Sequence, residues 1–292
     1  MHPIIDCFAE VSDRYEAAFV DLWGCLHNGR EPFPAAVAAL RAFVEKGGYV
    51  VLLTNAPRPQ QAVKQHLGKL GVPTDIWQAV ATSGDSAKAA VASGTYGRKV
   101  YHLGPDKDEA FFAADPDIPG IENIERVALD QAESVVCTGL FDDQTETPDD
   151  YAALLLDAKN RGLPMICANP DIVVDFGLKR LYCAGALAKA YSERGGEALY
   201  FGKPHPPIYD LARQRLTEAA GRVIPDARIV GVGDGILTDV PGAMGEGIDS
   251  LFISGGLAAA ETATDRSPEA DKLEDFLQAH KMSPTFTIGH LR

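Results

Sequence analysis

The chain has 292 residues, of which 46% are hydrophobic and 23% are charged, and its formal net charge at pH 7 is −14. This composition is typical of a soluble globular protein that is long enough to bury a core without disulfides or a structural metal. The negative charge excludes general binding to nucleic acids or anionic membranes, because phosphate groups would repel the protein surface. It does not exclude binding of a small phosphorylated ligand, because such a ligand interacts with the charges of its binding site rather than with the net charge of the whole surface.

The five cysteines are odd in number and widely spaced, and none belongs to a CxxC pair. This pattern favours reduced thiols, most of them buried and inert, over a disulfide framework or a zinc site. The N-terminus shows no basic segment followed by an apolar run, and no apolar run approaches the roughly 20 residues that span a bilayer. We therefore expect a cytoplasmic protein. The cysteines are Cys7, Cys25, Cys137, Cys167 and Cys183.

Short apolar runs alternate with helical patterns along the chain, and each run ends in a polar residue or a glycine. Continuous rather than alternating apolar residues are typical of parallel strands that are covered on both faces. The alternation of strands and helices therefore predicts an α/β fold with a parallel sheet. The predicted strands are residues 17–20, 49–53, 98–103, 133–137, 164–168, 228–233 and 250–253.

Two of the segments between these strands carry clear helix signals. Residues 33–48 have Pro34 near the start and two glycines past the end, with apolar side chains along one face. Residues 147–162 offer Thr147 as N-cap, acidic residues in the first turn and Gly162 as the stop.

The polar residues that follow the strands are where function is expected, because ligands of open parallel sheets bind outside the carboxyl ends of the strands. Asp21, Thr54 and Asp234 each end or follow an apolar run. Asp239 stands about one turn into the helix after Asp234, a spacing of oxygen ligands that suits Mg²⁺, although both acids could instead cap that helix. Lys203 lies in a rigid Gly/Pro loop, either as an aimed positive charge or as a solvated lysine.

The order of these motifs resembles the haloacid dehalogenase (HAD) superfamily of aspartate-nucleophile hydrolases. A strand ending in Asp21, a strand ending in Thr54, a loop with Lys203 and a GDxxxTD motif at Asp234 follow one another. The segments LLTNAPR, ANPD, CAGALA, GKPHPPIY and GDGILTD are similar to class IIA phosphatases, which include sugar-phosphate, phosphoglycolate and pyridoxal-phosphate phosphatases. The resemblance covers nearly the whole chain and implies a Rossmann-like parallel-sheet core with an inserted smaller α/β cap domain.

The spacing of the motifs places the insertion. Between Asp21 and Thr54 there is room for one helix and one strand only, whereas the stretch from Thr54 to Lys203 can hold a second α/β unit. This matches the class IIA cap, with substrate between cap and core, and related proteins are often homodimers through the cap. The predicted core is residues 1–82 and 198–292, and the predicted cap is residues 83–197.

The resemblance also implies catalytic roles. Asp21 attacks phosphorus and forms an aspartyl-phosphate. Thr54, with the backbone N–H of Asn55, holds the phosphoryl oxygens, and Lys203 offsets charge on Asp21 and on the transferring group. The implied substrate is a small phosphorylated metabolite, such as a sugar phosphate.

The implied cofactor is magnesium. Its ligands are Asp21, the carbonyl of Trp23 and Asp234, with Asp239 in support. Substrate specificity is expected from cap side chains in residues 169–186, and the substrate-binding candidates there are Asn169 and Asp171, together with Asn55.

One residue departs from the pattern of the superfamily. Most of its phosphatases carry a second aspartate two residues after the nucleophile, which protonates the leaving group and later activates water, whereas this chain has Trp23. An indole exchanges no proton near neutral pH, and the loss expected is on the order of 10²–10⁴-fold. A slow or specialised phosphatase, with His27 as the nearest replacement acid, is our first interpretation, and a phospho-ligand binding or regulatory protein is the second. Displacement at carbon is third, because Asp234 and Asp239 are retained and the cap comes late.

Overall fold

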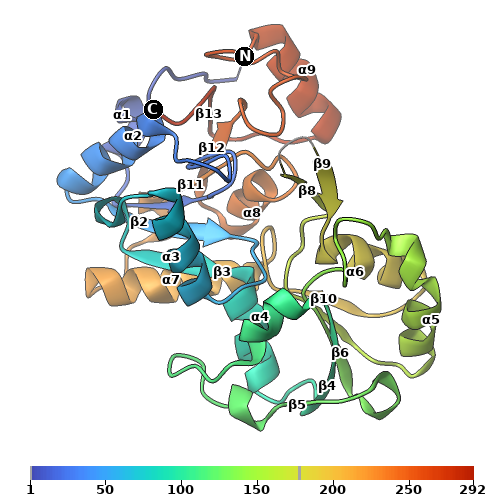
Figure 1. Ribbon diagram of the computed structural model, residues 1–292. Coiled ribbons are helices and arrows are strands. Elements are labelled where there is room, and N and C mark those ends of the chain that lie inside the picture. The colour runs from blue at the N-terminus through green and yellow to red at the C-terminus, as the bar shows by residue number, and fades with distance from the viewer. Residues whose placement is uncertain (1, 177–178) are drawn as a thin grey trace. The chain divides into compact units, whose positions relative to one another are not determined.

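The computed structural model describes residues 2–176 and 179–292 and divides the chain into two compact units (Figure 1). Each unit is built around its own parallel sheet and is described by itself. The first unit consists of Met1–Thr54, Lys64–Ala81 and Tyr209–Arg292, and the second of Asn55–Val63 and Thr82–Ile208.

The first unit contains a six-stranded sheet with the order β13-β12-β11-β1-β2-β3. Strand β1 lies inside this sheet and pairs in parallel with β2 and β11, and β12 pairs in parallel with β11 and β13. All residues of β1 are buried, which explains why its sequence is continuously apolar. The strands are β1 Ala17–Val20, β2 Tyr49–Thr54, β3 Ala79–Thr82, β11 Ile229–Gly233, β12 Asp249–Ile253 and β13 Phe286–Ile288.

Helices cover this sheet. Val240 of α8 and Leu273 and Leu277 of α9 share one buried apolar cluster with Phe252 of β12, so both helices pack on the same part of the sheet. The two chain ends lie side by side, because the Phe8 N–H donates to the Arg292 carbonyl at 2.7 Å. The helices are α1 Ala9–Ser12, α2 Pro34–Glu45, α3 Gln60–Leu70, α7 Pro206–Ala220, α8 Asp239–Glu246 and α9 Ala270–His280, and α3 and α7 each begin in the second unit.

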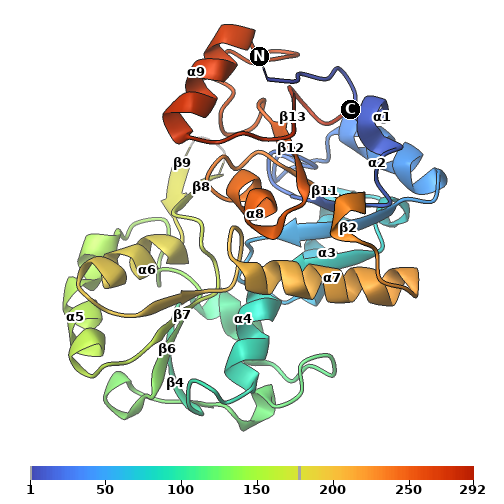
Figure 2. The same cartoon turned by 180° about the vertical axis from the view of Figure 1, so that it is seen from behind.

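The second unit contains a five-stranded parallel sheet with the order β10-β7-β6-β4-β5 (Figure 2). Val135 and Cys137 of β6 share one apolar cluster with Leu155 of α5, whereas Val136 shares another with Val91 of α4. Because successive residues of a strand point to opposite faces, helices cover both faces of this sheet. Its elements are α4 Ser83–Ala92, β4 Lys99–Leu103, β5 Glu125–Arg126, β6 Ser134–Cys137, α5 Ala152–Asn160, β7 Met165–Cys167, α6 Ala184–Glu193 and β10 Ala198–Tyr200.

A separate two-stranded antiparallel hairpin, β8 Val173–Phe176 and β9 Lys179–Tyr182, also belongs to the second unit. It is an exception to the parallel pairing that the sequence predicts. Residues 177 and 178, inside the range expected to set substrate specificity, lie outside the described residues.

The predicted α/β fold is confirmed. Each predicted strand is present within one residue at either end, and α2 begins at Pro34 as predicted. Thr147 caps a short 3₁₀ turn, Pro148–Tyr151, through a capping box with Asp150, and this turn leads into α5. Among the described residues, no helix combines the length and the apolar character needed to cross a membrane.

Candidate active site

Three neighbouring strands of the first unit end at the same edge of its sheet. In the register of β1, Val20 lies beside Leu52 of β2 and Val232 of β11. The backbone N–H of Asp21 continues this register by donating to the Val232 carbonyl at 2.8 Å. Thr54, at the end of β2, and Asp234, directly after β11, therefore flank Asp21 at the carboxyl edge, where ligands of such sheets bind.

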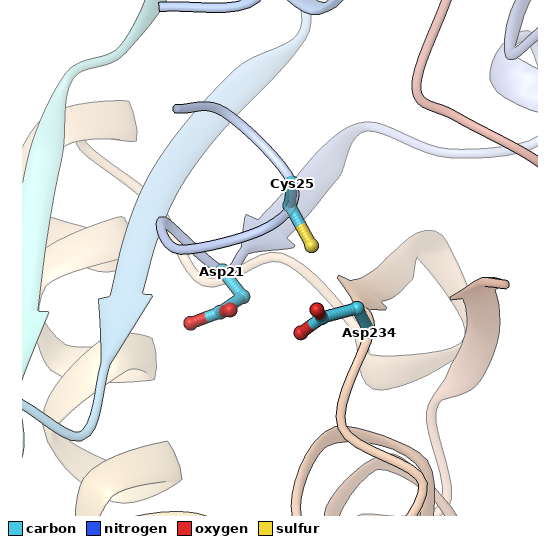
Figure 3. A group of neighbouring side chains, drawn as sticks. All are labelled: Asp21, Cys25 and Asp234. Carbon is cyan, nitrogen blue, oxygen red and sulfur yellow. The ribbon is translucent and has the colours of Figure 1, made fainter. Parts of the chain in front are cut away.

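Asp21 and Asp234 meet at this edge, and the thiol of Cys25 joins them. Each of the three side chains has a donor atom within 4.8 Å of the others. All three are nearly inaccessible to solvent, with 8% of Asp21, 4% of Asp234 and 1% of Cys25 exposed. Figure 3 shows the Cys25 sulfur directed toward the Asp234 carboxylate, with Asp21 beside them.

Two glycines allow the backbone to approach the Asp234 carboxylate this closely. Gly24 has φ of +76°, and a Cβ there would lie 2.2 Å from Asp234 Oδ2. A Cβ at Gly256 would lie 2.0 Å from the same oxygen, which accepts a hydrogen bond from the Leu257 N–H at 3.0 Å. The turn after β1 and the turn after β12 thus both need glycine, because any side chain would displace the carboxylate.

Asp239 is placed differently from the sequence prediction. It is the first residue of α8 rather than a residue one turn into the helix. Its carboxylate accepts hydrogen bonds from the Gly235 N–H at 3.0 Å and the Thr238 hydroxyl at 3.4 Å, and so it shapes the turn that carries Asp234. Within the described part of the chain, the cluster of donor atoms contains Cys25 and not Asp239.

The donor set at this edge fits a divalent cation. Two ionised carboxylates that are buried together repel each other strongly, and a cation between them removes that cost. Asp21 and Asp234 would supply two carboxylate oxygen ligands, and Mg²⁺ is commonly held by one or two carboxylates with water completing its octahedron. The roles of the Trp23 carbonyl and of Asp239 toward the cation stay predictions.

Trp23 is a packed aromatic residue. A Cβ at Gly29, where φ is +83°, would lie 2.2 Å from Cη2 of the indole, so the ring covers this glycine. The indole also stands edge-on to His27, with 5.5 Å between ring centroids. Both contacts fix the ring as part of the turn, and the indole offers no carboxyl group for proton transfer.

His27 is a poor replacement for the missing acid. Its side chain is buried, and Nδ1 accepts a hydrogen bond from the Gly29 N–H at 3.0 Å. Burial, with a smaller contribution from nearby His66, lowers the pKa of His27 to about 4. The ring is therefore neutral near pH 7 with its proton on Nε2, which contradicts the hypothesis that it serves as the general acid.

The remaining predicted residues lie together in the second unit, where the side chain of Asn55 joins two loops. Its Oδ1 accepts a hydrogen bond from the Lys203 N–H at 2.7 Å, and its Nδ2 donates to the Lys203 carbonyl at 3.1 Å. The same Nδ2 donates to the Asp171 carboxylate at 2.8 Å, and the Asp171 N–H donates to Asn169 at 3.0 Å. Lys203 is 2% exposed, which excludes the alternative of a solvated loop lysine.

Two features of this geometry escaped the sequence reasoning. The sequence prediction gave Cys25 no role at the site, and its place four residues after Asp21 in a glycine turn was the available signal. Asn55 was expected to act through its backbone, whereas its side chain holds the Lys203 loop. A contact between residues 148 positions apart leaves no recognisable pattern in a single sequence, so it could not be predicted.

A parallel sheet that gathers two buried carboxylates and a threonine at its carboxyl edge defines an α/β enzyme with a carboxylate-based centre. The comparisons with known proteins give the family. Residues 18–115 match the haloacid dehalogenase-like hydrolase model, and residues 200–279 match a second model that is HAD-hydrolase-like. A solved hydrolase of the haloacid dehalogenase-like family from Brucella suis 1330 is 39% identical with a TM-score of 0.85, and the match covers 99% of this chain and 100% of that one. The chain belongs to the haloacid dehalogenase-like family of hydrolases.

Two further relatives have named activities. The 5'-nucleotidase YutF of Bacillus subtilis (strain 168) is 24% identical over 253 residues, which are 86% of this chain and 91% of that protein. A solved glycerol phosphate phosphatase from Mycobacterium tuberculosis, in complex with magnesium, is 25% identical with a TM-score of 0.64, and the match covers 85% of this chain and 70% of that one.

Proposed function

We propose that this hydrolase is a magnesium-dependent phosphatase that acts on a small phosphorylated metabolite, such as a sugar phosphate, through an aspartyl-phosphate on Asp21. The buried pair of Asp21 and Asp234 at the carboxyl edge of the sheet is the observation that carries the proposal. The enzyme class, phosphoric monoester hydrolase, follows from the family together with its named phosphatases and nucleotidase.

In the proposed reaction, a carboxylate oxygen of Asp21 attacks phosphorus and the bond from phosphorus to the ester oxygen breaks. Water then attacks the phospho-aspartate, which releases inorganic phosphate and restores the carboxylate. The Thr54 hydroxyl and the Asn55 N–H hold the phosphoryl oxygens, and Lys203 offsets their charge. Magnesium, when bound by Asp21 and Asp234, supplies further neutralisation of charge.

The contacts of Asn55 support a positioning role for its side chain. Asn55 directly follows Thr54 in the chain, and its amide holds both backbone groups of Lys203. The side chain of Asn55 thus links the loop that is proposed to hold the phosphoryl group to Lys203, whose ammonium group is proposed to offset the charge of that group. We propose that residues 83–197, which lie within the second unit, form the cap, and that Asn169 and Asp171 contribute to substrate binding.

The turn after β1 supports a slow or specialised enzyme. The leaving group needs a proton in the first step and water needs a base in the second, and Trp23 supplies neither. His27 stays neutral because its pKa is about 4. Substrates with good leaving groups, such as aryl phosphates, are therefore expected to react fastest, and the phospho-enzyme is expected to be long-lived.

The test is phosphate release by purified protein that has been freed of metal with a chelator and then resupplied with Mg²⁺. An aryl phosphate and a panel of sugar, glycerol and nucleoside monophosphates serve as substrates, and Asp21→Asn is the matched control. Mg²⁺-dependent release that the control lacks supports the proposal. No release from any substrate, by folded protein that binds Mg²⁺ in calorimetry, overturns it.

A catalytically impaired phospho-ligand binding or regulatory protein is the second candidate, and the packing of Trp23 over Gly29 is the observation that favours it. A binder would gain thermal stability from a phosphorylated metabolite, because a ligand that binds only the folded state stabilises it. Stabilisation by the same metabolite without any phosphate release would select this candidate over the phosphatase.

A further inference from the structure

The edge of the first unit where we propose that Mg²⁺ binds also carries a thiol that neither the family comparison nor the proposed reaction requires. Sγ of Cys25 lies within 4.8 Å of the carboxylate oxygens of Asp21 and Asp234. Cys25 is 1% exposed, so its thiol is shielded from bulk solvent. Figure 3 shows its sulfur directed into the space between the turns that carry the two acids.

The three donor atoms lie within 4.8 Å of one another, which is close to the separation of ligands around one ion. Metal–sulfur bonds of zinc are about 2.3 Å and metal–oxygen bonds about 2.0–2.2 Å, so two ligands of one ion lie at most about 4.5 Å apart. Cys25, Asp21 and Asp234 approach this limit before any adjustment of side chains.

The backbone holds this arrangement in place. The Gly24 N–H donates to the His27 carbonyl at 3.0 Å, and the Leu26 N–H donates to the Leu22 carbonyl at 2.9 Å, so Cys25 sits inside a hydrogen-bonded turn. The direct approach of Gly24 to Asp234 ties that turn to the second acid. The thiol is therefore preorganised toward the carboxylates rather than brought there by chance mobility.

Three other thiols lie in different surroundings. They belong to the second unit, and Cys137 and Cys167 are buried in its apolar cluster. Burial raises the pKa of the Cys167 thiol to about 12. In the described part of the chain, the group of His, Cys, Asp and Glu side chains close enough to hold a metal contains Cys25 and none of these thiols.

Ligand chemistry then sets the preference for ions. Carboxylates and water suit Mg²⁺, whereas thiolate ligands select softer divalent ions such as Zn²⁺, and affinities rise from Mn²⁺ through Co²⁺ toward Cu²⁺. We propose that Cys25, Asp21 and Asp234 form a mixed sulfur–oxygen site that binds Zn²⁺ or Co²⁺ more tightly than Mg²⁺. The thiol proton passes to solvent as the sulfur–metal bond forms, and nothing is oxidised or reduced.

The consequence is regulatory and rests on the proposed magnesium-dependent function. Because the softer ion uses the same two carboxylates, it excludes Mg²⁺ from the site. Zn²⁺ therefore inhibits the phosphatase competitively with Mg²⁺.

The test titrates Co²⁺ into metal-free protein that is kept reduced with a phosphine, and records absorption in the near ultraviolet, where sulfur-to-cobalt charge transfer appears. The wild-type protein is expected to develop this band with saturation at one equivalent. Cys25→Ser, which replaces sulfur by oxygen with little change of shape, is expected to lose the band. Cys7→Ser is the matched control, because it removes a thiol of the same unit outside the cluster, and it is expected to keep the band.

Calorimetry supplies the second readout. Loss of even an outer-shell partner typically lowers metal affinity about 10–100-fold. Because Cys25 is proposed as a direct ligand, the ratio of Zn²⁺ to Mg²⁺ affinity is expected to fall at least roughly tenfold in Cys25→Ser. A wild-type protein without the band, or a folded Cys25→Ser variant that keeps it, overturns the proposal. If the wild-type protein lacks the band but releases phosphate in a Mg²⁺-dependent reaction, the sulfur site is refuted and the proposed phosphatase stands. If it shows the band but releases no phosphate, the sulfur site stands and the proposed phosphatase is refuted.

Discussion

The substitution Trp23→Asp tests the proposed chemistry most directly. If Asp21 is the nucleophile, a carboxyl group two residues later restores the proton donor that alkyl phosphates need, because their leaving groups are poor. The gain in kcat/KM on alkyl phosphates is bounded by the roughly 10²–10⁴-fold that positioned acid–base catalysis contributes. Aryl phosphates gain less, since their leaving groups depart with little protonation.

The structure sets the cost of this substitution. Removal of a fully buried tryptophan costs about 3–5 kcal/mol, and Trp23 is only half-buried, so roughly half that loss is expected. The edge-on contact with His27 contributes roughly 0.5–1.5 kcal/mol of this. Part of the catalytic gain is lost if the turn loosens.

Trp23→Asn is the matched control, because it leaves the same cavity and cannot transfer a proton near neutral pH. The assay is kcat/KM of both variants on an alkyl and an aryl phosphate, with Asp21→Asn added to show that turnover still depends on the nucleophile. The expected result is a ratio of Asp to Asn variants well above one for the alkyl phosphate. Equal activities of two folded, Mg²⁺-binding variants would refute the reasoning, because position 23 would then not be the acid–base position.

Three further predictions concern the turn and the loop that hold the site. Gly24→Ala should abolish Mg²⁺ binding in calorimetry, because its Cβ would lie 2.2 Å from a carboxylate oxygen of Asp234. The control is Gly71→Ala, where φ is +81° and nothing lies within 4 Å of the added Cβ. It should lower the free energy of unfolding by only the roughly 1–2 kcal/mol of a left-handed alanine and leave Mg²⁺ binding intact. Asn55→Ala should lower the free energy of unfolding by about 1–3 kcal/mol in urea titrations, because the buried Lys203 N–H loses its acceptor, and it should lower kcat more than it raises KM. The pKa of His27 is depressed to about 4, so its contribution to stability is present above pH 6.5 and is lost as the pH falls toward 4. Chemical unfolding should therefore show a lower free energy of unfolding at pH 5 than at pH 7, and His27→Gln should remove this difference. An equal difference in the variant would exclude His27 as its source.

The sequence was sufficient for the four inner strands of the first unit's sheet and for the positions of Asp21, Thr54 and Asp234 at its carboxyl edge. Continuous apolar runs predicted β1, β2 and β11, and parallel strands carry their carboxyl ends to one edge, so Asp21 and Asp234 could be brought together without coordinates. Six of the described strands were missed, namely β3 and β13 at the two edges of this sheet and β5, β8, β9 and β10 of the second unit, since segments of two to four residues carry little periodic signal. Propensity and periodicity describe residues that are close in sequence, and they carry no information on residues that are close in space but distant in sequence.

The same limit explains what was missed in the site. The backbone of Lys203 is held by the side chain of Asn55, which is 148 positions away. The place of Cys25 depends on Gly24 lying directly on Asp234. None of these contacts is a repeat or a motif, and each decides what the residue can do chemically.

The indole at position 23 is therefore more than one exchanged side chain. Its ring occupies the space above Gly29, where no side chain fits, and Gly29 in turn donates to His27, so that imidazole is held neutral beneath the same turn. A carboxylate at position 23 would vacate the space over Gly29, remove the aromatic contact of His27 and place a negative charge near that ring, which favours the protonated imidazole. The substitution thus couples proton chemistry to the state of His27, and Trp23→Asp combined with His27→Gln separates the two. If the gain on alkyl phosphates survives in the double variant, the new carboxyl group acts alone; if it disappears, the proton comes through the imidazole.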